Sequence, residues 1–293
     1  MNTDDTILIF GRSGQVAREL SRRASGATCL GRAEVDLATP EACADAICRH
    51  APDAVINAAA FTAVDQAETQ EALATTINAQ APTAMALACA NLDIPLVHIS
   101  TDYVFDGAGS AAFMPEDPPA PLGAYGHSKL AGEEGVRAAG GTHVILRTSW
   151  VFAGHGGNFV RTMLRLGGER DRLHVVADQI GGPAPAAAIA AACLQIAAQL
   201  RAAPNRSGTY HLAGADPVSW AGFARAIMAE AGLPCVIEDI LTRDYPTAAP
   251  RPLNSRLDCS SLTRAFGIHL PDWRAALPVI IAELQAGHAR HLA

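Results

Sequence analysis

Short apolar runs alternate with longer mixed segments along the first half of the chain. Runs with the length and apolar content of buried strands lie at 7–10, 27–30, 54–57, 94–99 and 144–146. Segments typical of helices lie between and after them, at 15–25, 40–50, 68–91 and 128–139. Strands that alternate with helices in this way form a parallel sheet with helices on both faces, joined by right-handed crossovers. The pattern predicts an α/β fold with a Rossmann-like, doubly wound parallel sheet.

The second half of the chain is less regular. Helices are expected at 158–166, 186–200, 220–231 and 273–285, and short strands at 173–176 and 209–212. Residues 245–254 are rich in proline and typical of a loop. We expect one domain over residues 1–150, to which the strands near 173–176 and 209–212 return. A smaller mixed α/β domain would occupy mainly residues 151–293 and interleave with the first.

Composition narrows the class of partner. The chain has 293 residues and a net charge of −7, which argues against binding to the phosphate backbone of nucleic acid. It has no uninterrupted apolar stretch of about 18 residues, so no membrane span is expected. Residues 1–5 are polar and acidic and lack the basic region of a signal peptide. The cysteines are scattered and are typical of small buried hydrophobes in a reducing compartment, which predicts a cytoplasmic protein.

A glycine-containing turn follows the first expected strand and opens the first expected helix. Gly11 permits a tight turn, and Gly14 lets a pyrophosphate approach the backbone N–H groups at the helix N-terminus. Ala17 is small enough for close packing of helix on strand. Such a pattern alone also fits an ordinary turn, but its place after a strand and before a helix favours a dinucleotide site. Its members are Gly11, Ser13, Gly14, Gln15 and Val16.

The end of the second expected strand bears on the choice of cofactor. An NAD site places an acidic residue there for the ribose hydroxyls, whereas this chain has Gly31 followed by Arg32. A guanidinium suits a 2′-phosphate, which favours NADPH, although Glu34 and Asp36 lie nearby and leave NADH open. Small residues from Asn57 to Ala60, including Ala58, would let a cofactor lie flat across the strand ends.

Three side chains form a candidate set for carbonyl chemistry. Thr101 follows the strand at 94–99, and Tyr125 and Lys129 are spaced to share one face of a helix. A tyrosine with a pKa of about 10 is a proton donor at neutral pH, and a nearby ammonium lowers that pKa towards the working range. The Thr101 hydroxyl can stabilise the developing alkoxide while a nicotinamide supplies hydride. Tyrosine and lysine at this spacing are common by chance, so the prediction depends on the glycine turn and the strand-end threonine together.

With these residues in place, the chain resembles the extended short-chain dehydrogenase/reductases that act on nucleotide sugars. More narrowly, it is similar to the dTDP-4-dehydrorhamnose reductase family over nearly its whole length. The matching segments are 11–16, 57–60, 62–65, 100–107, 121–122, 125–126, 128–133, 147–152, 158–159, 163–165, 178–179, 251–252, 254–255 and Leu257. The cluster from Arg251 to Leu257 is unusual in the wider superfamily and makes the narrower resemblance specific.

The resemblance implies reduction of the C4 keto group of dTDP-4-dehydro-L-rhamnose by NADPH or NADH, giving dTDP-L-rhamnose, a precursor of cell-surface polysaccharide. It implies that residues 1–150 are the NAD(P)-binding Rossmann domain and that residues 151–293 mainly bind substrate. The implied catalytic residues are Thr101, Tyr125 and Lys129. The resemblance implies further cofactor contacts at Asp36, Leu37, Ala60, Phe61 and Thr62. Together with the glycine-containing turn, the full set also includes Arg32, Ala58, Tyr125 and Lys129. The candidate substrate contacts are Ser100, Thr101, Tyr125, Trp150, Asn158, Arg251 and Asn254.

Three of the candidate substrate contacts have simpler alternatives. Trp150 fits a sugar-stacking platform or a core residue. Asn158 fits a diphosphate contact or a helix N-cap. Arg251 fits a phosphate ligand or a solvated loop residue.

The resemblance also raises a metal question. Some relatives dimerise around a magnesium ion held by glutamates, and Glu19 matches one such ligand. The segment 185–189 has alanine where another glutamate would fall. Because a hard divalent cation needs several oxygen ligands, we expect no metal, a solvated Glu19 carboxylate, and a monomer or a metal-free homodimer.

Two other functions remain open at this point. The first is a nucleotide-sugar epimerase or dehydratase of the same superfamily, because dehydratases place an acid after the threonine, where this chain has Asp102. Residues 103–105 and 251–255 favour the reductase. The second is a non-catalytic dinucleotide-binding regulatory subunit, like that of methionine adenosyltransferase. The intact set of Thr101, Tyr125 and Lys129 argues against it.

Overall fold

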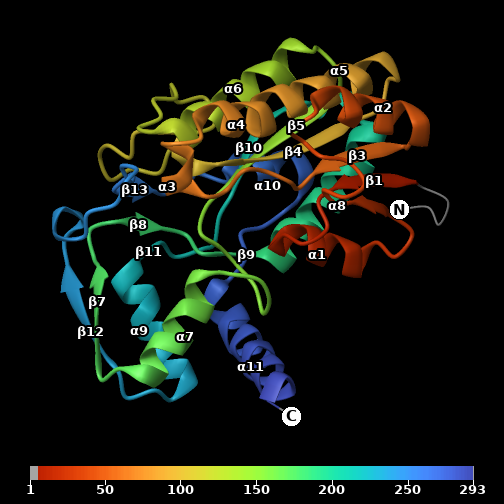
Figure 1. The fold of residues 1–293 in the computed structure, drawn as a ribbon. Coiled ribbons are helices and arrows are strands. Elements are labelled where there is room, and N and C mark those ends of the chain that lie inside the picture. The colour runs from red at the N-terminus through yellow and green to blue at the C-terminus, as the bar shows by residue number, and fades with distance from the viewer. Residues whose placement is uncertain (1–5, 293) are drawn as a thin grey trace.

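Six parallel strands form the central sheet, in the order β10-β5-β4-β3-β1-β2 (Figure 1). The strands are β1 (Ile7–Phe10), β2 (Thr28–Leu30), β3 (Ala54–Asn57), β4 (Leu96–Thr101), β5 (His143–Thr148) and β10 (Gly208–Leu212). The computed structural model describes residues 6–292 and the side chains of residues 6–286. The predicted α/β class with a doubly wound parallel sheet is confirmed.

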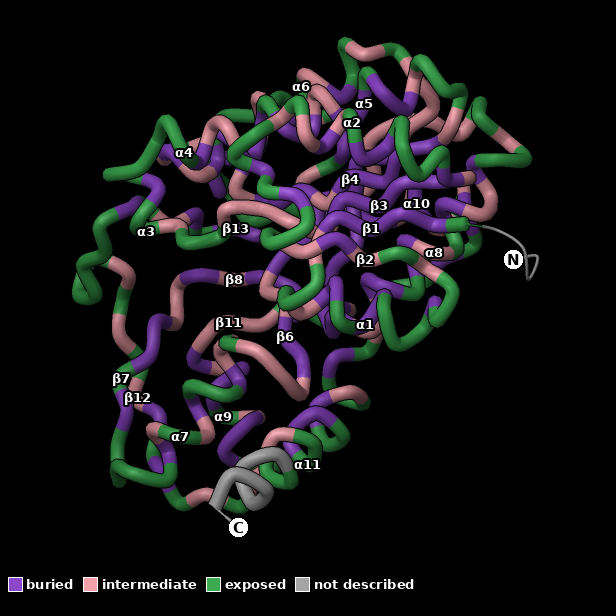
Figure 2. Tube along the Cα trace, turned by 45° about the vertical axis from the view of Figure 1, so that its right-hand side comes forward, coloured by how far each residue is buried: buried purple, intermediate pink, exposed green. Residues whose placement is uncertain are grey.

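Helices cover both faces of this sheet because its strands are apolar on both sides (Figure 1). One face carries α2 (Pro40–His50), α5 (Ala81–Asn91) and α6 (Ala124–Ala138), and the other carries α1 (Gln15–Arg23), α8 (Ala186–Ala202) and α10 (Ser260–Phe266). The most deeply buried backbone runs through β1, β3 and β4 (Figure 2). This core holds the carboxyl ends of the strands in fixed positions.

The segment predicted as one helix over 68–91 is interrupted. It contains α4 (Glu71–Thr75), a π-helical turn η1 (Thr76–Gln80) and α5, with the short α3 (Val64–Ala67) before it. A π-turn adds a residue to the helical ladder and often marks a functional site. Here it buries Asn78, whose side chain binds both backbone groups of Phe61 and the Ser128 hydroxyl. The turn therefore joins the strand-end loop after β3 to α6.

A second lobe has a hydrophobic core of its own. It contains α7 (Phe159–Glu169), α9 (Trp220–Ala231), α11 (Trp273–Leu292), β7 (Arg172–Val176) and β12 (Val236–Ile240). Phe152, Val160, Phe223 and Trp273 are central members of this core. In Figure 1 these helices lie below the sheet, with the β7–β12 pair at their edge.

One prediction about this lobe is wrong. The strand near 173–176 does not return to the central sheet, because β7 pairs in parallel with β12. Exposed and buried positions alternate over the first four residues of β7, and the His174 side chain is exposed beside Glu238. A strand with one polar face suits a two-stranded sheet covered on one side and not a central position buried on both faces. In contrast, the strand near 209–212 is β10 of the central sheet.

Small elements connect the two lobes. The strands are β6 (Val151–Phe152) with β9 (Ala184–Pro185), and β11 (Val218–Ser219), β8 (Ile180–Gly181) and β13 (Asn254–Ser255). Short 3-10 turns are η2 (Asp102–Val104), η3 (Pro204–Arg206) and η4 (Thr242–Asp244). Among residues 6–292, no helix is both long and apolar enough to cross a membrane.

Close approach of α6 to η1 requires a glycine, which gives a stability prediction. A Cβ at Gly132 would lie 2.0 Å from the Asn78 carbonyl oxygen, so Gly132→Ala must push the helix outward. We expect a loss of about 1–3 kcal/mol in the free energy of unfolding, measured by urea denaturation. Gly168→Ala is the matched control, because that Cβ meets nothing within 4 Å. It should gain roughly 0.5–1 kcal/mol from helix propensity. Equal effects of the two changes would contradict this packing.

Candidate functional site

A cleft of about 700 Å³ lies at the carboxyl ends of β1, β3, β4 and β5. The sheet reverses its strand order between β1 and β3, and ligands of open α/β sheets bind at such a switch point. The cleft is lined by most of the candidate residues from the sequence. They are Gly11, Ser13, Gly14, Gln15, Val16, Arg32, Asp36, Leu37, Ala58, Ala60, Thr62, Ser100, Thr101, Tyr125, Lys129 and Trp150.

The glycine turn has the geometry that its sequence suggests. Gly11 has φ of 121°, a conformation that side chains rarely adopt, and its N–H donates to the Leu30 carbonyl at 2.8 Å. A Cβ there would lie 3.1 Å from both the Ala17 Cβ and the Ala58 oxygen. The turn leads directly into α1, which begins at Gln15. Because the first N–H groups of a helix lack partners within it, this end of α1 can bind a phosphate.

Arginines stand on the rim of the cleft beyond β2. Arg32 is exposed and lines the cleft, as the sequence predicted for a 2′-phosphate ligand. Arg12 also lines it, and its guanidinium binds Glu34 at 2.5 Å and the Cys29 carbonyl at 2.8 Å. Arg12 was not among the residues predicted from the sequence, although its position inside the glycine turn is a usable signal. Glu34 is thereby paired with Arg12 and with the Gly31 N–H.

Thr101 and Tyr125 come together from β4 and α6. The helix begins at Ala124, earlier than the predicted start at 128, so Tyr125 lies in its first turn. A Cβ at Gly126 would lie 2.3 Å from the Tyr103 carbonyl oxygen, which shows how closely this turn packs on η2. The Thr101 hydroxyl accepts a hydrogen bond from the Tyr103 N–H at 3.2 Å and donates one to the Asp102 Oδ1 at 3.1 Å.

The pKa of Tyr125 differs from expectation. Burial raises the pKa of this phenol to about 12, and a hydrogen bond with Thr101 offsets only part of the effect. From the sequence, the Lys129 ammonium was expected to lower the pKa of Tyr125. In the structure the Lys129 Nζ instead donates to the Ile99 carbonyl at 2.8 Å, and burial lowers the pKa of that lysine to about 8. The Tyr125 phenol is therefore protonated at neutral pH.

Asp102 follows the last residue of β4, Thr101, and contacts its hydroxyl. Its side chain is buried, and burial raises its pKa to about 6 despite hydrogen bonds with Ser255 and Thr101. Ser255 belongs to β13, so the carboxyl group joins the segment after residue 250 to the end of β4. This placement makes Asp102 a residue that orients Thr101.

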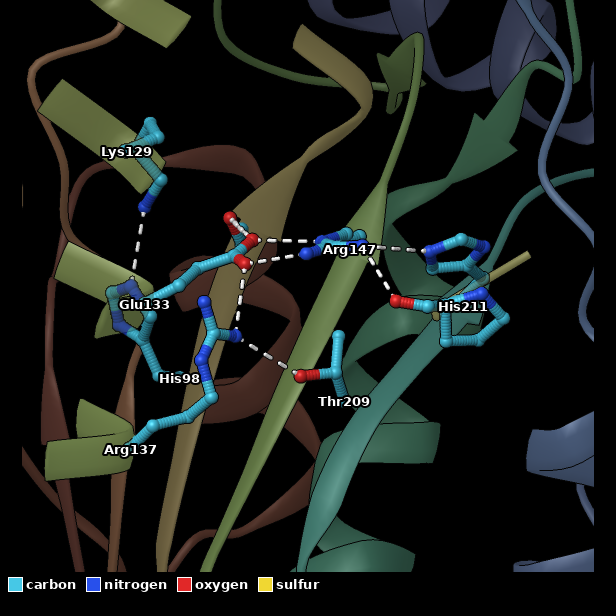
Figure 3. Close-up of polar contacts among 9 residues, drawn as sticks. His98, Lys129, Glu133, Arg137, Arg147, Thr209 and His211 are labelled. Carbon is cyan, nitrogen blue, oxygen red and sulfur yellow. Dashed lines mark hydrogen bonds and ion pairs between the residues drawn. The ribbon is translucent and has the colours of Figure 1, made fainter. Parts of the chain in front are cut away.

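A buried ion pair attaches α6 to β5, one helical turn after Lys129 (Figure 3). Glu133 is fully buried and binds Arg147 of β5 through two contacts, of 2.9 and 2.6 Å. The Ser100 hydroxyl donates to the same carboxylate at 2.6 Å, so this candidate substrate contact is engaged within the protein. Burial favours a higher pKa for Glu133, but the bonds from Arg147 and Ser100 outweigh it and hold the pKa below its usual value.

Trp150 is held in an uncommon position at the cleft. Its φ is 49°, in the left-handed region, and its ring stacks on Trp220 at 3.5 Å. The Trp220 indole donates to Gln179 at 3.2 Å, which in turn donates to Thr242. The second lobe thus fixes the orientation of a side chain that lines the cleft.

Four candidates do not line the cleft: Phe61, Asn158, Arg251 and Asn254. Asn158 is the N-cap of α7, accepting from the Arg161 N–H at 3.0 Å, and it also donates to Gln15. Arg251 pairs with Asp65 at 2.8 Å, which attaches the proline-rich loop to the residues after β3. Asn254 is buried and donates to the Ala111 carbonyl at 2.7 Å. The N-cap alternative for Asn158 is confirmed, and its partner Arg161 lies only three residues away. The contacts of Arg251 and Asn254 could not be predicted because their partners are distant in sequence.

Glu19 corrects one expectation. The carboxylate is not solvated but buried, and it pairs with Arg22, Arg23 and His155. Burial favours a higher pKa, yet the bonds from His155 and Arg23 hold the pKa of Glu19 below its ordinary value. Within residues 6–286, no group of three or more metal-ligating side chains gathers.

Several lining residues were not among the predicted contacts. They include Arg12, Val64, Ile77, Ile99, Asp102, Tyr103, Thr148, Ser149, Val151, Gly156 and Gly157. Most flank a predicted contact at a strand end, so extending each strand-end motif by one or two residues would have found them. Ile77 gave no such signal, because only the π-turn brings it to the cleft.

Comparisons with known proteins agree over nearly the whole chain. The family model described as "RmlD substrate binding domain" matches residues 5–286. The chain is 44% identical to a dTDP-4-dehydrorhamnose reductase of Burkholderia thailandensis, covering 95% of this chain and 98% of that protein. It is 42% identical to one of Sinorhizobium fredii, covering 91% of this chain and 93% of that protein.

Solved structures with the same description are also similar. The crystal structure of a dTDP-4-dehydrorhamnose reductase from Clostridium acetobutylicum has a TM-score of 0.90 and 35% identity, covering 96% of this chain and 99% of that one. The corresponding structure from Bacillus anthracis, in complex with NADP, has a TM-score of 0.87 and 32% identity, covering 95% and 99%.

The Glu133–Arg147 pair predicts a pH-dependent stability. Glu133→Gln leaves a buried guanidinium without its counter-charge and should cost about 3–5 kcal/mol of unfolding free energy at pH 7. Because the folded pKa of Glu133 lies below its ordinary 4.5, this stabilisation is complete above that value. It is lost as the pH falls through the folded pKa.

Denaturant unfolding at several pH values measures the difference between wild type and variant. Glu169→Gln, which removes an exposed pair with Arg165, is the control and should change stability by less than about 0.5 kcal/mol. A difference between wild type and Glu133→Gln that stays constant down to acidic pH would contradict the ionised, buried state of Glu133.

Proposed function

Because the chain belongs to the dTDP-4-dehydrorhamnose reductase family, we propose that it reduces the C4 keto group of dTDP-4-dehydro-L-rhamnose to give dTDP-L-rhamnose. The family predicted from the sequence is thereby confirmed, and the protein is an NADPH-dependent oxidoreductase. One observation carries the chemistry. Thr101, Tyr125 and Lys129 meet in the same cleft as the glycine turn.

The residues of the cleft fit a nicotinamide dinucleotide. The space that a Cβ would fill at Gly11 is already occupied by backbone and Ala17, and the open end of α1 faces the cleft. The N–H groups of this end can hold the pyrophosphate. Arg32 and Arg12 supply positive charge for a 2′-phosphate, which supports a preference for NADPH over NADH. When bound, the cofactor supplies the hydride.

Proton transfer to the substrate oxygen is the work of Tyr125. Its raised pKa keeps the phenol protonated, so it can donate a proton as negative charge develops on the C4 oxygen. Thr101 is held beside it by Tyr103 and Asp102 and can hydrogen-bond the same oxygen. The charged form of Lys129 stabilises the phenolate that remains and can hold the nicotinamide ribose.

Trp150 and the second lobe supply the sugar-binding side of the cleft in this proposal. The stacking of Trp150 on Trp220 presents a rigid, apolar ring edge or face to a sugar without loss of side-chain entropy. This supports the assignment of residues 151–293 mainly to substrate binding. Asn158 would act through Gln15, and Arg251 through the loop that it fastens to Asp65.

The alternative functions have less support. Every curated relative named above is a reductase, and the environment of Asp102 supports a role in orienting Thr101. The substrate is a small nucleotide sugar. Placement in the cytoplasm stays a prediction from the sequence.

The function is tested by an NADPH oxidation assay. dTDP-4-dehydro-L-rhamnose is made in situ from dTDP-glucose by the upstream enzymes, and NADPH absorbance is followed. We expect substrate-dependent oxidation, faster with NADPH than with NADH. No oxidation with either cofactor would reject the proposed activity.

Tyr125→Phe tests the proton donor. Because only the hydroxyl is removed, the variant should bind NADPH as the wild type does, by fluorescence titration, while kcat falls by about 10²-fold or more. Tyr210→Phe is the matched control, since its hydroxyl bonds the Arg206 carbonyl outside the cleft. Its turnover should be unchanged. Wild-type turnover in Tyr125→Phe would remove the tyrosine from the mechanism.

The oligomeric state tests the metal question. Glu19 is saturated by its three cationic or imidazole partners, which supports a monomer or a metal-free homodimer. Light scattering should therefore give the same mass with magnesium and with EDTA. A dimer that dissociates on chelation would show that the ion pairs of Glu19 give way to a metal.

A further inference from the structure

Three buried side chains form a chain that reaches the cleft, which Asn57 and Lys129 line. Asn57 ends β3, His98 is its register partner on β4, and Lys129 reaches them from α6. The Asn57 Nδ2 lies 3.1 Å from the His98 Nδ1. On the other side of the ring, the His98 Nε2 lies 3.4 Å from the Lys129 Nζ, and Figure 3 shows this second contact. The mechanism above uses Lys129 but gives no role to His98.

The amide of Asn57 has a fixed orientation. Its Oδ1 accepts the backbone N–H of Ala59 at 3.1 Å, and a backbone N–H can only donate. The other end of the amide is therefore the NH₂ group, and it faces the imidazole of His98. Since NH₂ can only donate, the His98 Nδ1 must be the acceptor.

The acceptor role of Nδ1 determines the tautomer of His98. The ring is completely buried, and burial, the largest cause, holds its pKa well below the ordinary value. A neutral imidazole carries one proton, and with Nδ1 accepting, that proton resides on Nε2. An N–H group therefore faces the Lys129 Nζ.

Only one form of Lys129 can accept this hydrogen. The uncharged amine has a lone pair for the His98 N–H and two hydrogens, one of which can go to the Ile99 carbonyl at 2.8 Å. The ammonium has no lone pair with which to accept this hydrogen. Its own N–H groups would face the N–H group of the ring, so two donors would meet. We propose that His98 is a positioning residue that presents a fixed N–H to Lys129 and so stabilises the uncharged amine of that lysine in the unliganded protein.

The groups around Lys129 act in the opposite direction or are occupied. Glu133, one turn along α6, favours the ammonium, but its carboxylate is already bound by Arg147, Arg137 and Ser100. Asp102, Tyr103 and Tyr125 face the same space from η2 and α6, and His143 lies near His98 on β5. Burial outweighs Glu133 and lowers the lysine pKa to about 8, and the His98 N–H acts in the same direction as burial.

The inference deepens the proposed function, because it concerns the residue proposed to stabilise the phenolate of Tyr125. A lysine that titrates near neutrality can change its charge when a cofactor hydroxyl or phosphate enters the cleft. At a pH above the pKa of Lys129, the unliganded protein would hold this side chain as the uncharged amine. When the cofactor enters the cleft, the amine would take up a proton and become the ammonium. His98 would set the pH at which this happens.

The chain offers a direct readout, because Lys129 is its only lysine. In protein grown with ¹³Cε-lysine and carrying a lysine-free tag, the Cε resonance in a ¹H–¹³C spectrum reports this one side chain. Its pH titration gives the pKa of Lys129 without cofactor, substrate or turnover. The wild type should titrate at about pH 8.

His98→Leu removes the donor and should raise this midpoint by about one unit, the equivalent of one hydrogen bond. His98→Gln is the conservative rescue, because its amide can accept from Asn57 and donate to Lys129 in the same order. It should return the midpoint to near the wild-type value. His211→Leu is the matched control, since this buried imidazole bonds Arg147 and Phe113 but not Lys129.

A midpoint that is unchanged or lowered in His98→Leu would overturn the proposal. So would an equal rise in His98→Gln, because the Gln variant folds around the same polar chain, or an equal rise in His211→Leu. The outcome is independent of the proposed reaction. A protein inactive on the sugar nucleotide could still show the expected titration, and an active one could lack it.

Discussion

A buried carboxylate–guanidinium pair, Glu133 with Arg147, ties the catalytic helix to the central sheet. Tyr125, Lys129, Glu133 and Arg137 recur at four-residue intervals and so share one face of α6, which packs on β4 and β5. Without a strong attachment, a helix that follows a proline-rich loop could slide or fray at its first turn. The pair fixes both the depth and the rotation of α6, and with them the place of Tyr125.

The same attachment has an electrostatic consequence. The negative charge of Glu133, one turn from Lys129, would normally hold that lysine fully protonated. The ion pairs of Glu133 with Arg147 and Arg137 weaken this effect. Lys129 is thus left to burial and to its neighbour His98, both of which disfavour the charged form. The cleft therefore contains a lysine whose charge is poised near neutral pH, beside a phenol and a carboxyl group that burial keeps protonated to higher pH than usual.

The second lobe contributes orientation more than charge. Trp150 follows β5 with a left-handed backbone and is fixed there by Trp220, whose indole is in turn held by Gln179. Asp65 and Arg251 join the loop after β3 to the proline-rich segment, and Asp102 joins β4 to β13. These cross-connections hold the two lobes around the cleft, so the sugar side and the nicotinamide side are positioned relative to one another.

The sequence alone determined the features that depend on local pattern. Apolar runs alternating with helices predicted the parallel sheet, because strands buried on both faces have few other arrangements. The Gly11 turn, the strand-end Thr101 and the Tyr125–Lys129 spacing were visible because each lies within a few residues of its structural cause. Only the tertiary structure decided the pairing of β7 with β12, the burial of Glu19 with His155, and the partners of Ser100, Arg251 and Asn254. These depend on contacts between residues far apart along the chain, which no local pattern encodes. The charge of Lys129 also depends on such contacts. The groups that influence it are the Ile99 carbonyl of β4, the Asn57 amide and the His98 imidazole, which come together only in the fold.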